Sequence, residues 1–157
     1  MEPKIEPATI DNLKDIQGLN LMLFKREYDE FDKTFNCEWT MSNEGEEYFK
    51  NRITKEDGCA YIAVAGDEII GYLVGGMYEE VHYRKPAIFA ELENMFVLET
   101  YRGKGVGTQL YRAFVEWCKS KRVWRIHVVA SAQNTDGINF YRKNGFVDYD
   151  LALEADI

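Results

Sequence analysis

The feature that most constrains the fold is a strand, a glycine-rich loop and a helix that follow one another in mid-chain. Residues 87–98 are predicted to form a long strand, which stops just before the sequence RGKGVG at 102–107. The helix that follows is predicted to be amphipathic, because its apolar residues share one face: Val106, Leu110, Ala113, Phe114, Trp117 and Cys118. A helix with one apolar face must pack on another element, so this unit predicts a helix lying against a sheet.

The hydrophobic patterns outside this unit complete an α/β chain with ten predicted elements. The other predicted segments are strand 4–8, helix 10–23, helix 42–54, strand 58–65, strand 69–78, strand 123–130, helix 136–143 and strand 146–153. Gly66-Asp67-Glu68 suits a tight hairpin, so the strands on either side of it are expected to pair antiparallel. The chain has 157 residues without a linker-like stretch, and we expect one domain over residues 1–157.

The charge balance and the cysteines restrict the partners and the compartment. Nineteen Lys and Arg against 27 Asp and Glu give a net charge of −8, which argues against a nucleic-acid binder and favours small cationic partners. Cys37, Cys59 and Cys118 are odd in number and widely spaced, so no disulfide framework is indicated. No apolar run reaches the ~18 residues of a membrane span, and the first residues lack a signal-peptide core. The sequence therefore predicts a cytoplasmic protein that binds neither nucleic acid nor a membrane.

The glycine-rich loop has the chemistry of an anion site. Free amides at a helix N-terminus bind phosphate, and glycine lets a ligand approach the backbone closely. A P-loop starting at Gly103 would need its second glycine where Thr108 stands. The dinucleotide motif G-x-G-x-x-G fails as well, because Thr108 or Leu110 replaces its last glycine. The loop therefore indicates an anionic ligand that neither of these two motifs describes.

The loop contains R-x-x-G-x-G, formed by Arg102, Gly105 and Gly107. This motif resembles the acyl-CoA pyrophosphate loop of the GNAT N-acetyltransferase superfamily. The resemblance extends back through ELENMFV at 91–97 and forward to INFYRKNGF at 138–146, and the predicted element order agrees with it. It implies the GNAT fold, which is a mixed, mostly antiparallel central sheet flanked by helices, with two splayed central strands.

The resemblance implies acetyl-CoA as co-substrate, with the pantetheine arm along 94–98 and the pyrophosphate on the loop amides. The residues that it assigns to acetyl-CoA are Met95, Phe96, Val97, Arg102, Gly103, Lys104, Gly105, Val106, Gly107, Thr108, Asn134 and Tyr141. Arg102 and Lys104 would add positive charge beside the pyrophosphate, with a solvated loop residue as the alternative for Lys104. Asn134 would contact the arm, with a helix cap as its alternative.

Two glutamates are candidates for the catalytic base. Attack of an aliphatic amine, with a pKa of about 10.4, on a thioester needs a group that takes its proton. Glu91 and Glu93 lie two apart on the predicted strand, so both side chains leave the same face. Glu93 is the first choice because LENMFV resembles the Leu-Glu-Asp-aromatic-aromatic-Val stretch of spermidine/spermine acetyltransferases, with Asn94 replacing the Asp. Histone-acetylating relatives carry their base where Glu91 falls, and either glutamate has the alternative of a solvated polar residue.

Tyr141 is the candidate acid. It matches a tyrosine of the last family helix, whose hydroxyl would protonate the departing CoA thiolate. The alternative is an aromatic ring packed on the core with its hydroxyl at the surface.

The remaining cysteine and histidine residues do not predict a reactive site. Cys118 lies on the apolar face of the central helix, which favours a buried structural thiol over a nucleophile. His82 and His127 are isolated and lack metal-ligand spacing, so no metal is predicted.

An acidic run after the first predicted helix, KREYDEFD at 25–32, is the candidate acceptor site. In the superfamily this region often borders the acceptor, so Glu27, Tyr28 and Asp29, together with Glu93, are the substrate-binding candidates. Carboxylates and an aromatic ring would attract a cationic amine. The alternative is a solvated charged face.

These observations lead to one principal hypothesis about function and two alternatives. The principal hypothesis is an N-acetyltransferase that moves an acetyl group from acetyl-CoA to a primary amine of a polyamine-like or other cationic small molecule. The transfer would occur in a ternary complex, without a covalent enzyme intermediate. One alternative is acetylation of a peptide or protein amine, and the other is a non-catalytic acyl-CoA-binding sensor domain. The resemblance also implies a homodimer.

Overall fold

The computed structural model describes residues 2–78, 83–85 and 88–157. The helices are α1 (Leu13–Glu30), α2 (Asn43–Thr54), α3 (Val106–Ser120) and α4 (Thr135–Lys143), with short 3-10 turns at Ile10–Asn12, Trp39–Met41 and Glu99–Tyr101. The strands are β1 (Lys4–Pro7), β2 (Gly58–Ala65), β3 (Glu68–Met77), β4 (Phe89–Val97) and β5 (Arg125–His127). The predicted α/β order is therefore confirmed from the first strand through α4.

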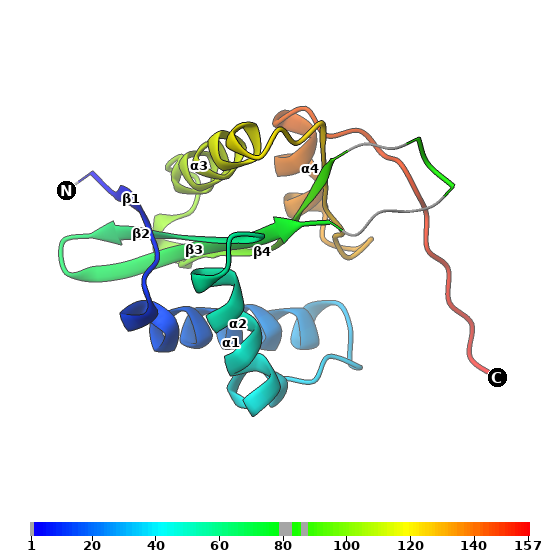
Figure 1. The fold of residues 1–157 in the computed structure, drawn as a ribbon. Coiled ribbons are helices and arrows are strands. Elements are labelled where there is room, and N and C mark those ends of the chain that lie inside the picture. Colours follow the sequence, from blue (N-terminus) through cyan, green and yellow to red (C-terminus); the bar gives the residue numbers. More distant parts are fainter. Residues whose placement is uncertain (1, 79–82, 86–87) are drawn as a thin grey trace.

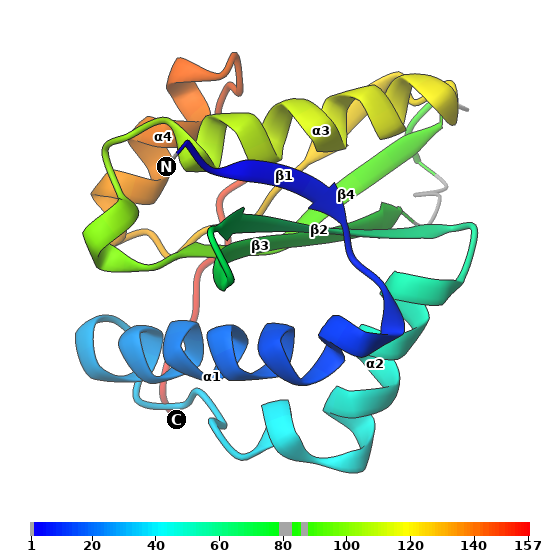
Figure 2. The ribbon, with the colours of Figure 1, turned by 90° about the vertical axis from the view of Figure 1, so that its left-hand side faces the viewer.

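The five strands form one sheet in the order β1-β2-β3-β4-β5. The first three pairings are antiparallel, and β4 pairs with β5 in parallel. A parallel neighbour needs a crossover, and α3 supplies it between these two strands. In Figures 1 and 2, α1 and α2 lie on one side of the sheet, and α3 and α4 lie on the other. The expected mixed, mostly antiparallel sheet flanked by helices is thus confirmed.

Each face of the sheet carries its own hydrophobic core. The core under α3 contains Leu73, Ala90, Leu92, Leu110 and Phe114 among its buried members. The core under α1 and α2 contains Leu13, Ile16, Phe49, Tyr72 and Phe96. β4 contributes to both cores, with Ala90 and Leu92 in the core under α3 and Phe96 in the core under α1 and α2. β4 is therefore packed against helices on both of its faces.

Four predicted segments differ from the structure in their bounds or are absent from it. The first helix extends to Glu30, so the acidic run lies on its last turns rather than after it. The strand predicted at 123–130 is reduced to Arg125–His127, and residues 146–153 form no strand. A strand exists only where a partner pairs with it, and no described residues pair with these two segments beyond the three rungs of β5 with β4. The predicted strand at 87–98 begins at Phe89, and Ala87 lies outside the described residues.

Among the described residues, no helix combines the length and the apolar character needed to cross a membrane.

Gly75 is a position where we expect substitution to destabilise the protein. A Cβ added there would lie 2.6 Å from both the Glu91 carbonyl oxygen and Cε2 of Phe114. Gly75→Ala should therefore lower the free energy of unfolding by about 1–3 kcal/mol, since the tight core must shift. Gly18 in α1 has nothing within 4 Å of its added Cβ, so Gly18→Ala should raise that free energy by about 0.5–1 kcal/mol. Urea unfolding of both variants checks this, and equal stabilities would contradict the packing described here.

Candidate active site

The two parallel strands β4 and β5 separate part of the way along the sheet. In the described residues they pair at three rungs, the last being Glu91 with His127, while β4 continues to Val97. From there on, no described strand pairs with β4 on its β5 side. A backbone edge left open between two strands can accept hydrogen bonds from an extended ligand. The expected splayed strands are present, and residues 94–98 lie on this open edge or directly after it.

A β-bulge in β4 determines where the candidate bases point. Val74 pairs with Asn94 and Gly75 with Leu92, so Glu93 has no partner residue on β3. Because of the extra residue, Glu93 and Asn94 both point toward the α1 and α2 side, where they contact side chains of α1, α2 and β3. Glu91 lies between Ala90 and Leu92 of the α3-side core, so alternation sends its side chain to the same α1 and α2 side. The two glutamates therefore share a face, as expected.

The glycine loop presents free amides at the start of α3. Gly103 and Gly105 have φ of +70° and +81°, left-handed values that favour glycine. The first α3 hydrogen bond back to the loop runs from the Gln109 amide to the Gly105 carbonyl, so the amides of residues 106–108 precede it. Gly105 is the N-cap and offers these amides no side chain. A helix start of this kind binds phosphate through its amides and its partial positive charge.

The two basic side chains of the loop turn back onto the chain. Arg102 Nε donates to the Val97 carbonyl at 2.8 Å, and its guanidinium lies 5.0 Å from the centre of the Phe96 ring. Burial, followed by the charge of Arg26, lowers the pKa of Arg102. Lys104 Nζ donates to the Thr100 carbonyl at 2.9 Å. Arg102 therefore fastens the loop to the end of β4, and both side chains are held beside the loop amides.

Glu93 is held by two residues of α2. The Arg52 guanidinium binds both carboxylate oxygens, with Nη2 2.6 Å from Oε1 and Nε 3.0 Å from Oε2. The Tyr48 hydroxyl also donates to Oε2. The Arg52 and Glu93 side chains are 23% and 13% exposed, so this is a largely buried, two-point ion pair. Burial raises the pKa of Tyr48, and the charge of Glu93 raises it further.

A chain of hydrogen bonds continues from Tyr48 into the protein interior. The Asn94 amide donates to the Tyr48 hydroxyl at 3.2 Å, and the Tyr72 hydroxyl donates to Asn94 Oδ1 at 2.6 Å. Asn20 of α1 donates to the Tyr72 hydroxyl at 2.9 Å and accepts from Thr40 at 2.7 Å. Asn20, Thr40 and Tyr72 are fully buried, so the network fixes the bulge between both helices. Asn94, which replaces the Asp of the spermidine/spermine pattern, contributes both a donor and an acceptor here.

Glu91 differs from Glu93 in its surroundings. Its carboxylate forms no ion pair or hydrogen bond with the described residues, and it is half-buried at the last rung before the strands separate. Burial raises the pKa of Glu91, and the neighbouring Glu93 charge raises it further. His127 and Arg52 act in the opposite direction. Glu91 is therefore the glutamate that has no fixed partner, and its surroundings raise its pKa.

Tyr141 on α4 is packed between two rings and has no hydrogen-bond partner among the described side chains. Its ring is edge-on to Phe140 and Phe146, each 5.5 Å away between centroids. Burial, followed by the charge of Glu27, raises the pKa of Tyr141 to about 12. Gly107 lies close to α4, because a Cβ added there would be 3.4 Å from Phe140. The tyrosine thus lies on a helix that packs against the glycine loop.

The candidate acceptor residues are only partly brought together. Glu27 is half-buried near Tyr141, and burial raises its pKa. Tyr28 is 40% exposed with Lys33 over its ring, and Asp29 is exposed. Among the other acids of the run, Glu30 binds Arg26, and Asp32 accepts from Thr34. The end of α1 therefore directs Glu27 inward and leaves the rest at the surface.

Asn134 and Cys118 have structural contacts. Asn134 caps α4 by accepting from the Gly137 amide at 3.0 Å, which matches the cap alternative and leaves its side-chain NH₂ available. Cys118 is 3% exposed in the α3 core, and burial raises its pKa to about 12, which leaves it a thiol. His127 stacks on Tyr78, whereas His82 lies outside the described residues. In the described part of the chain, no three His, Cys, Asp or Glu side chains gather as metal ligands would.

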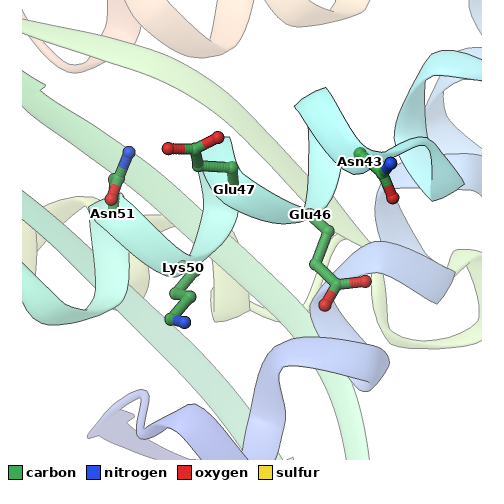
Figure 3. Close-up of a pocket in the computed structure, with 5 residues that line it drawn as sticks. All are labelled: Asn43, Glu46, Glu47, Lys50 and Asn51. Carbon is green, nitrogen blue, oxygen red and sulfur yellow. The ribbon is translucent and has the colours of Figure 1, made fainter.

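A surface pocket on α2 is separate from these residues (Figure 3). All its lining residues belong to α2: Asn43, Glu46, Glu47, Lys50 and Asn51. Glu46 is paired there with Lys14 at 3.0 Å. The pocket shares no residue with the glycine loop or the β4 glutamates.

Sequence reasoning missed Tyr48 and Arg52, which hold the first-choice base. The sequence contained one signal for a large side chain at this place: the hairpin places two glycines opposite each other. Gly58 pairs with Gly76, and a Cβ added at either glycine would lie 2.9–3.1 Å from the nearest atoms of Arg52. Two facing glycines leave room for a large side chain above them. Tyr48 stands one helical turn before Arg52 on the same face.

Comparison with known proteins agrees with this geometry. Residues 24–146 match the acetyltransferase (GNAT) family. The uncharacterized N-acetyltransferase YobR of Bacillus subtilis is 36% identical over 58 residues, which are 37% of this chain and only 24% of YobR. Streptothricin acetyltransferase A of B. subtilis is 27% identical over 87% of this chain and 80% of its own length. The structure of AAC(6′)-Iy with a bisubstrate analogue has a TM-score of 0.78 at 18% identity, covering 100% of this chain and 99% of that one. This chain belongs to the GNAT acetyltransferase family.

Proposed function

We propose that this protein transfers the acetyl group of acetyl-CoA to a primary amine of a small cationic molecule in a ternary complex. The observation that carries the proposal is the arrangement along β4. The glycine loop, with its free amides, follows one end of the open edge. The partly buried carboxylate of Glu91, whose pKa is raised, lies at the other end. Membership of the GNAT family makes acetyl-CoA the acyl donor that fits this arrangement.

The residues along the loop and the β4 edge fit acetyl-CoA, which would supply the activated acetyl thioester. The amides of residues 103–108 would hold the pyrophosphate, with Arg102 and Lys104 beside them. The backbone of Met95, Phe96 and Val97 would pair with the extended arm, since this side of β4 has no described partner. The free NH₂ of Asn134 would add a contact from the start of α4.

Glu91 is the proposed base, in preference to the first-choice Glu93. A carboxylate bound at two points by arginine is a weak proton acceptor, because taking a proton breaks the ion pair. Glu91 has no such partner, and burial raises its pKa, which makes its carboxylate a better proton acceptor than an ordinary glutamate. Glu93 is then a positioning residue that raises the basicity of Glu91 and adds negative charge for a cationic acceptor.

Tyr141 is the proposed donor to the departing thiolate. Burial holds its pKa near 12, so the hydroxyl keeps its proton at every physiological pH. A neutral phenol can donate a hydrogen bond to the sulfur as negative charge develops on it. Glu27, which lies near Tyr141 from the end of α1, would face the acceptor on the same side.

The proposed acceptor class is a small molecule with several amines, such as a polyamine or an amine-bearing antibiotic. The chain carries a net charge of −8, which would attract such a cation. One of the relatives reported above is named a streptothricin acetyltransferase, and a protein of the same fold is named an aminoglycoside N-acetyltransferase. Both names describe acetylation of a small molecule, and neither identifies the acceptor of this chain.

An acceptor panel tests the proposal. Purified protein with acetyl-CoA would be assayed for thiol release with polyamines, streptothricin, aminoglycosides and lysine-containing peptides, and products checked by mass spectrometry. We expect release that depends on one of the small amines and a product carrying one added acetyl group. Release with peptides alone would replace the small-molecule acceptor by a protein amine. Binding of acetyl-CoA without release across the panel would favour a sensor domain instead.

A further inference from the structure

His127 is a titratable side chain at the point where β4 and β5 separate, and the mechanism proposed above does not use it. It pairs with Glu91 at the last rung between the two strands. Ile126 and Val128, on either side of His127, pack against the core under α3. Alternation therefore sends the imidazole to the α1 and α2 side, which is also the side of Glu91.

The imidazole is oriented by Tyr78, the residue that follows β3. The two rings are stacked, with their centroids 4.9 Å apart and their planes inclined by 28°. The Tyr78 amide donates to the Phe89 carbonyl at 2.9 Å, which fixes the backbone that carries the tyrosine ring to the start of β4. Stacking occupies a face of the imidazole and leaves its two nitrogens, at the ring edge, available for proton exchange. The His127 side chain is half-buried, so water reaches it.

The charge of His127 acts on Glu91. Burial and then the charge of Glu93 raise the pKa of Glu91, whereas His127 and Arg52 lower it. His127 has the larger effect of these two cations, although Arg52 is bound to the neighbouring Glu93. A carboxylate and an imidazole at paired positions of adjacent strands are within reach of each other, directly or through one water molecule. The geometry and the charge coupling therefore place His127 beside the proposed base.

The proposed reaction leaves a proton that must be removed from the site. An ammonium group and an acetyl thioester give an amide, a thiol and one proton, because the new N–C bond replaces the C–S bond and the thiolate is itself protonated. Glu91 receives a proton from the amine, and its half-buried carboxyl must return it to water before the next acceptor is deprotonated. An imidazole suits this task, because it takes up and releases protons near neutral pH.

We propose that His127 is the proton carrier of this site: its unprotonated ring nitrogen takes the proton from Glu91, and the imidazolium then releases it to water. In each turnover one proton moves from the ammonium group to Glu91, from Glu91 to His127 and from His127 to solvent, and both side chains return to their starting states. Tyr78 is a positioning residue that holds the imidazole in place for this transfer. The inference rests on the proposed function, because it concerns the proton that Glu91 removes from the acceptor.

The first test needs no acceptor and measures whether the two groups are coupled in solution. The carboxyl carbon of Glu91 is titrated by NMR in the unsubstituted protein and in two variants of β5. His127→Gln removes a cation that lowers the pKa of Glu91, so that pKa should rise further. The matched control is Arg125→Gln, two residues earlier on the same strand, which should leave the pKa unchanged. An unchanged pKa of Glu91 in His127→Gln would overturn the proposal, because the two groups would be too far apart.

The second test is the rescue of turnover by small bases. With the acceptor identified by the panel, His127→Ala should lower kcat by about 10²-fold, at the lower end of the range for a proton-transferring group, because Glu91 still loses its proton slowly to water. Added imidazole should restore kcat in proportion to its concentration. Pyrazole has the same size and is a much weaker base, so it should restore little. A loss of turnover that neither compound restores, or that both restore equally, would show a structural role and overturn the proposal.

Failure of this inference can be distinguished from failure of the proposed function. Turnover by the unsubstituted protein together with full activity of His127→Ala would overturn the role of His127 and leave the acetyltransferase intact. No thiol release by the unsubstituted protein with any acceptor would overturn the proposed function, and the role of His127 with it.

Discussion

Replacing Glu91 by glutamine should lower kcat by about 10²- to 10⁴-fold, which is the usual contribution of a general base. Glutamine keeps the size of the side chain and cannot take the proton of the attacking amine. Acetyl-CoA binding should change little, because the proposed contacts of acetyl-CoA begin farther along β4 and continue in the loop. Steady-state kinetics with the acceptor identified by the panel, together with calorimetry of acetyl-CoA binding, measures both quantities.

The matched control for Glu91→Gln is Glu44→Gln, on the exposed start of α2, which should keep the activity of the unsubstituted protein. Glu93→Gln is the informative second variant. If Glu93→Gln abolishes turnover while Glu91→Gln leaves it unchanged, the roles of the two glutamates are reversed from those proposed here.

Arg52→Met should lower the free energy of unfolding by about 3 kcal/mol, because it leaves the carboxylate of Glu93 largely buried and without its cation. The value is at the lower end for a broken buried pair, since both side chains keep some exposure. The double variant Arg52→Met/Glu93→Gln removes both charges and should recover most of the loss. Urea unfolding of the single and double variants measures the coupling, and a stable Arg52→Met protein would show that the pair contributes little.

The same ion pair should determine the pH dependence of turnover. Glu91 must be ionised to accept a proton, so activity falls as pH drops through its raised pKa. The negative charge of Glu93 raises that pKa and the positive charge of Arg52 lowers it. Glu93→Gln should therefore move the acid limb of the kcat profile to lower pH, and Arg52→Gln should move it to higher pH. The pH profiles of both variants are measured with the same acceptor. Acid limbs that move in the same direction in the two variants, or that do not move, would exclude this coupling.

The glycine loop and the order of the elements could be predicted from the sequence because their signals are local. Glycines before an amphipathic helix are visible within a few residues, and the loop is found with Gly103 and Gly105 at positive φ. The strand predicted at 123–130 is shortened to β5, and the one predicted at 146–153 is absent, for a different reason. Their residues have strand character, but pairing depends on a partner that the described part of one chain does not supply.

The contacts of the candidate bases could not be predicted for a third reason. Period-two alternation places Glu91 and Glu93 on one face, but the bulge that turns Asn94 to the same side depends on packing between β3 and β4. Arg52 reaches Glu93 across 41 residues of sequence, through space that Gly58 and Gly76 leave open. A long-range ion pair of this kind has no local signature, so the preference for Glu93 as base rested on the resemblance alone.

The most direct measurement of the central claim is hydrogen–deuterium exchange with and without acetyl-CoA. The claim is that acetyl-CoA lies along the open edge of β4 with its pyrophosphate on the loop before α3. The amides of residues 95–98 and 103–108 should then exchange more slowly when acetyl-CoA is present, while those of β1 should be unaffected. Unchanged exchange in both β4 and the loop at saturating acetyl-CoA would contradict the account.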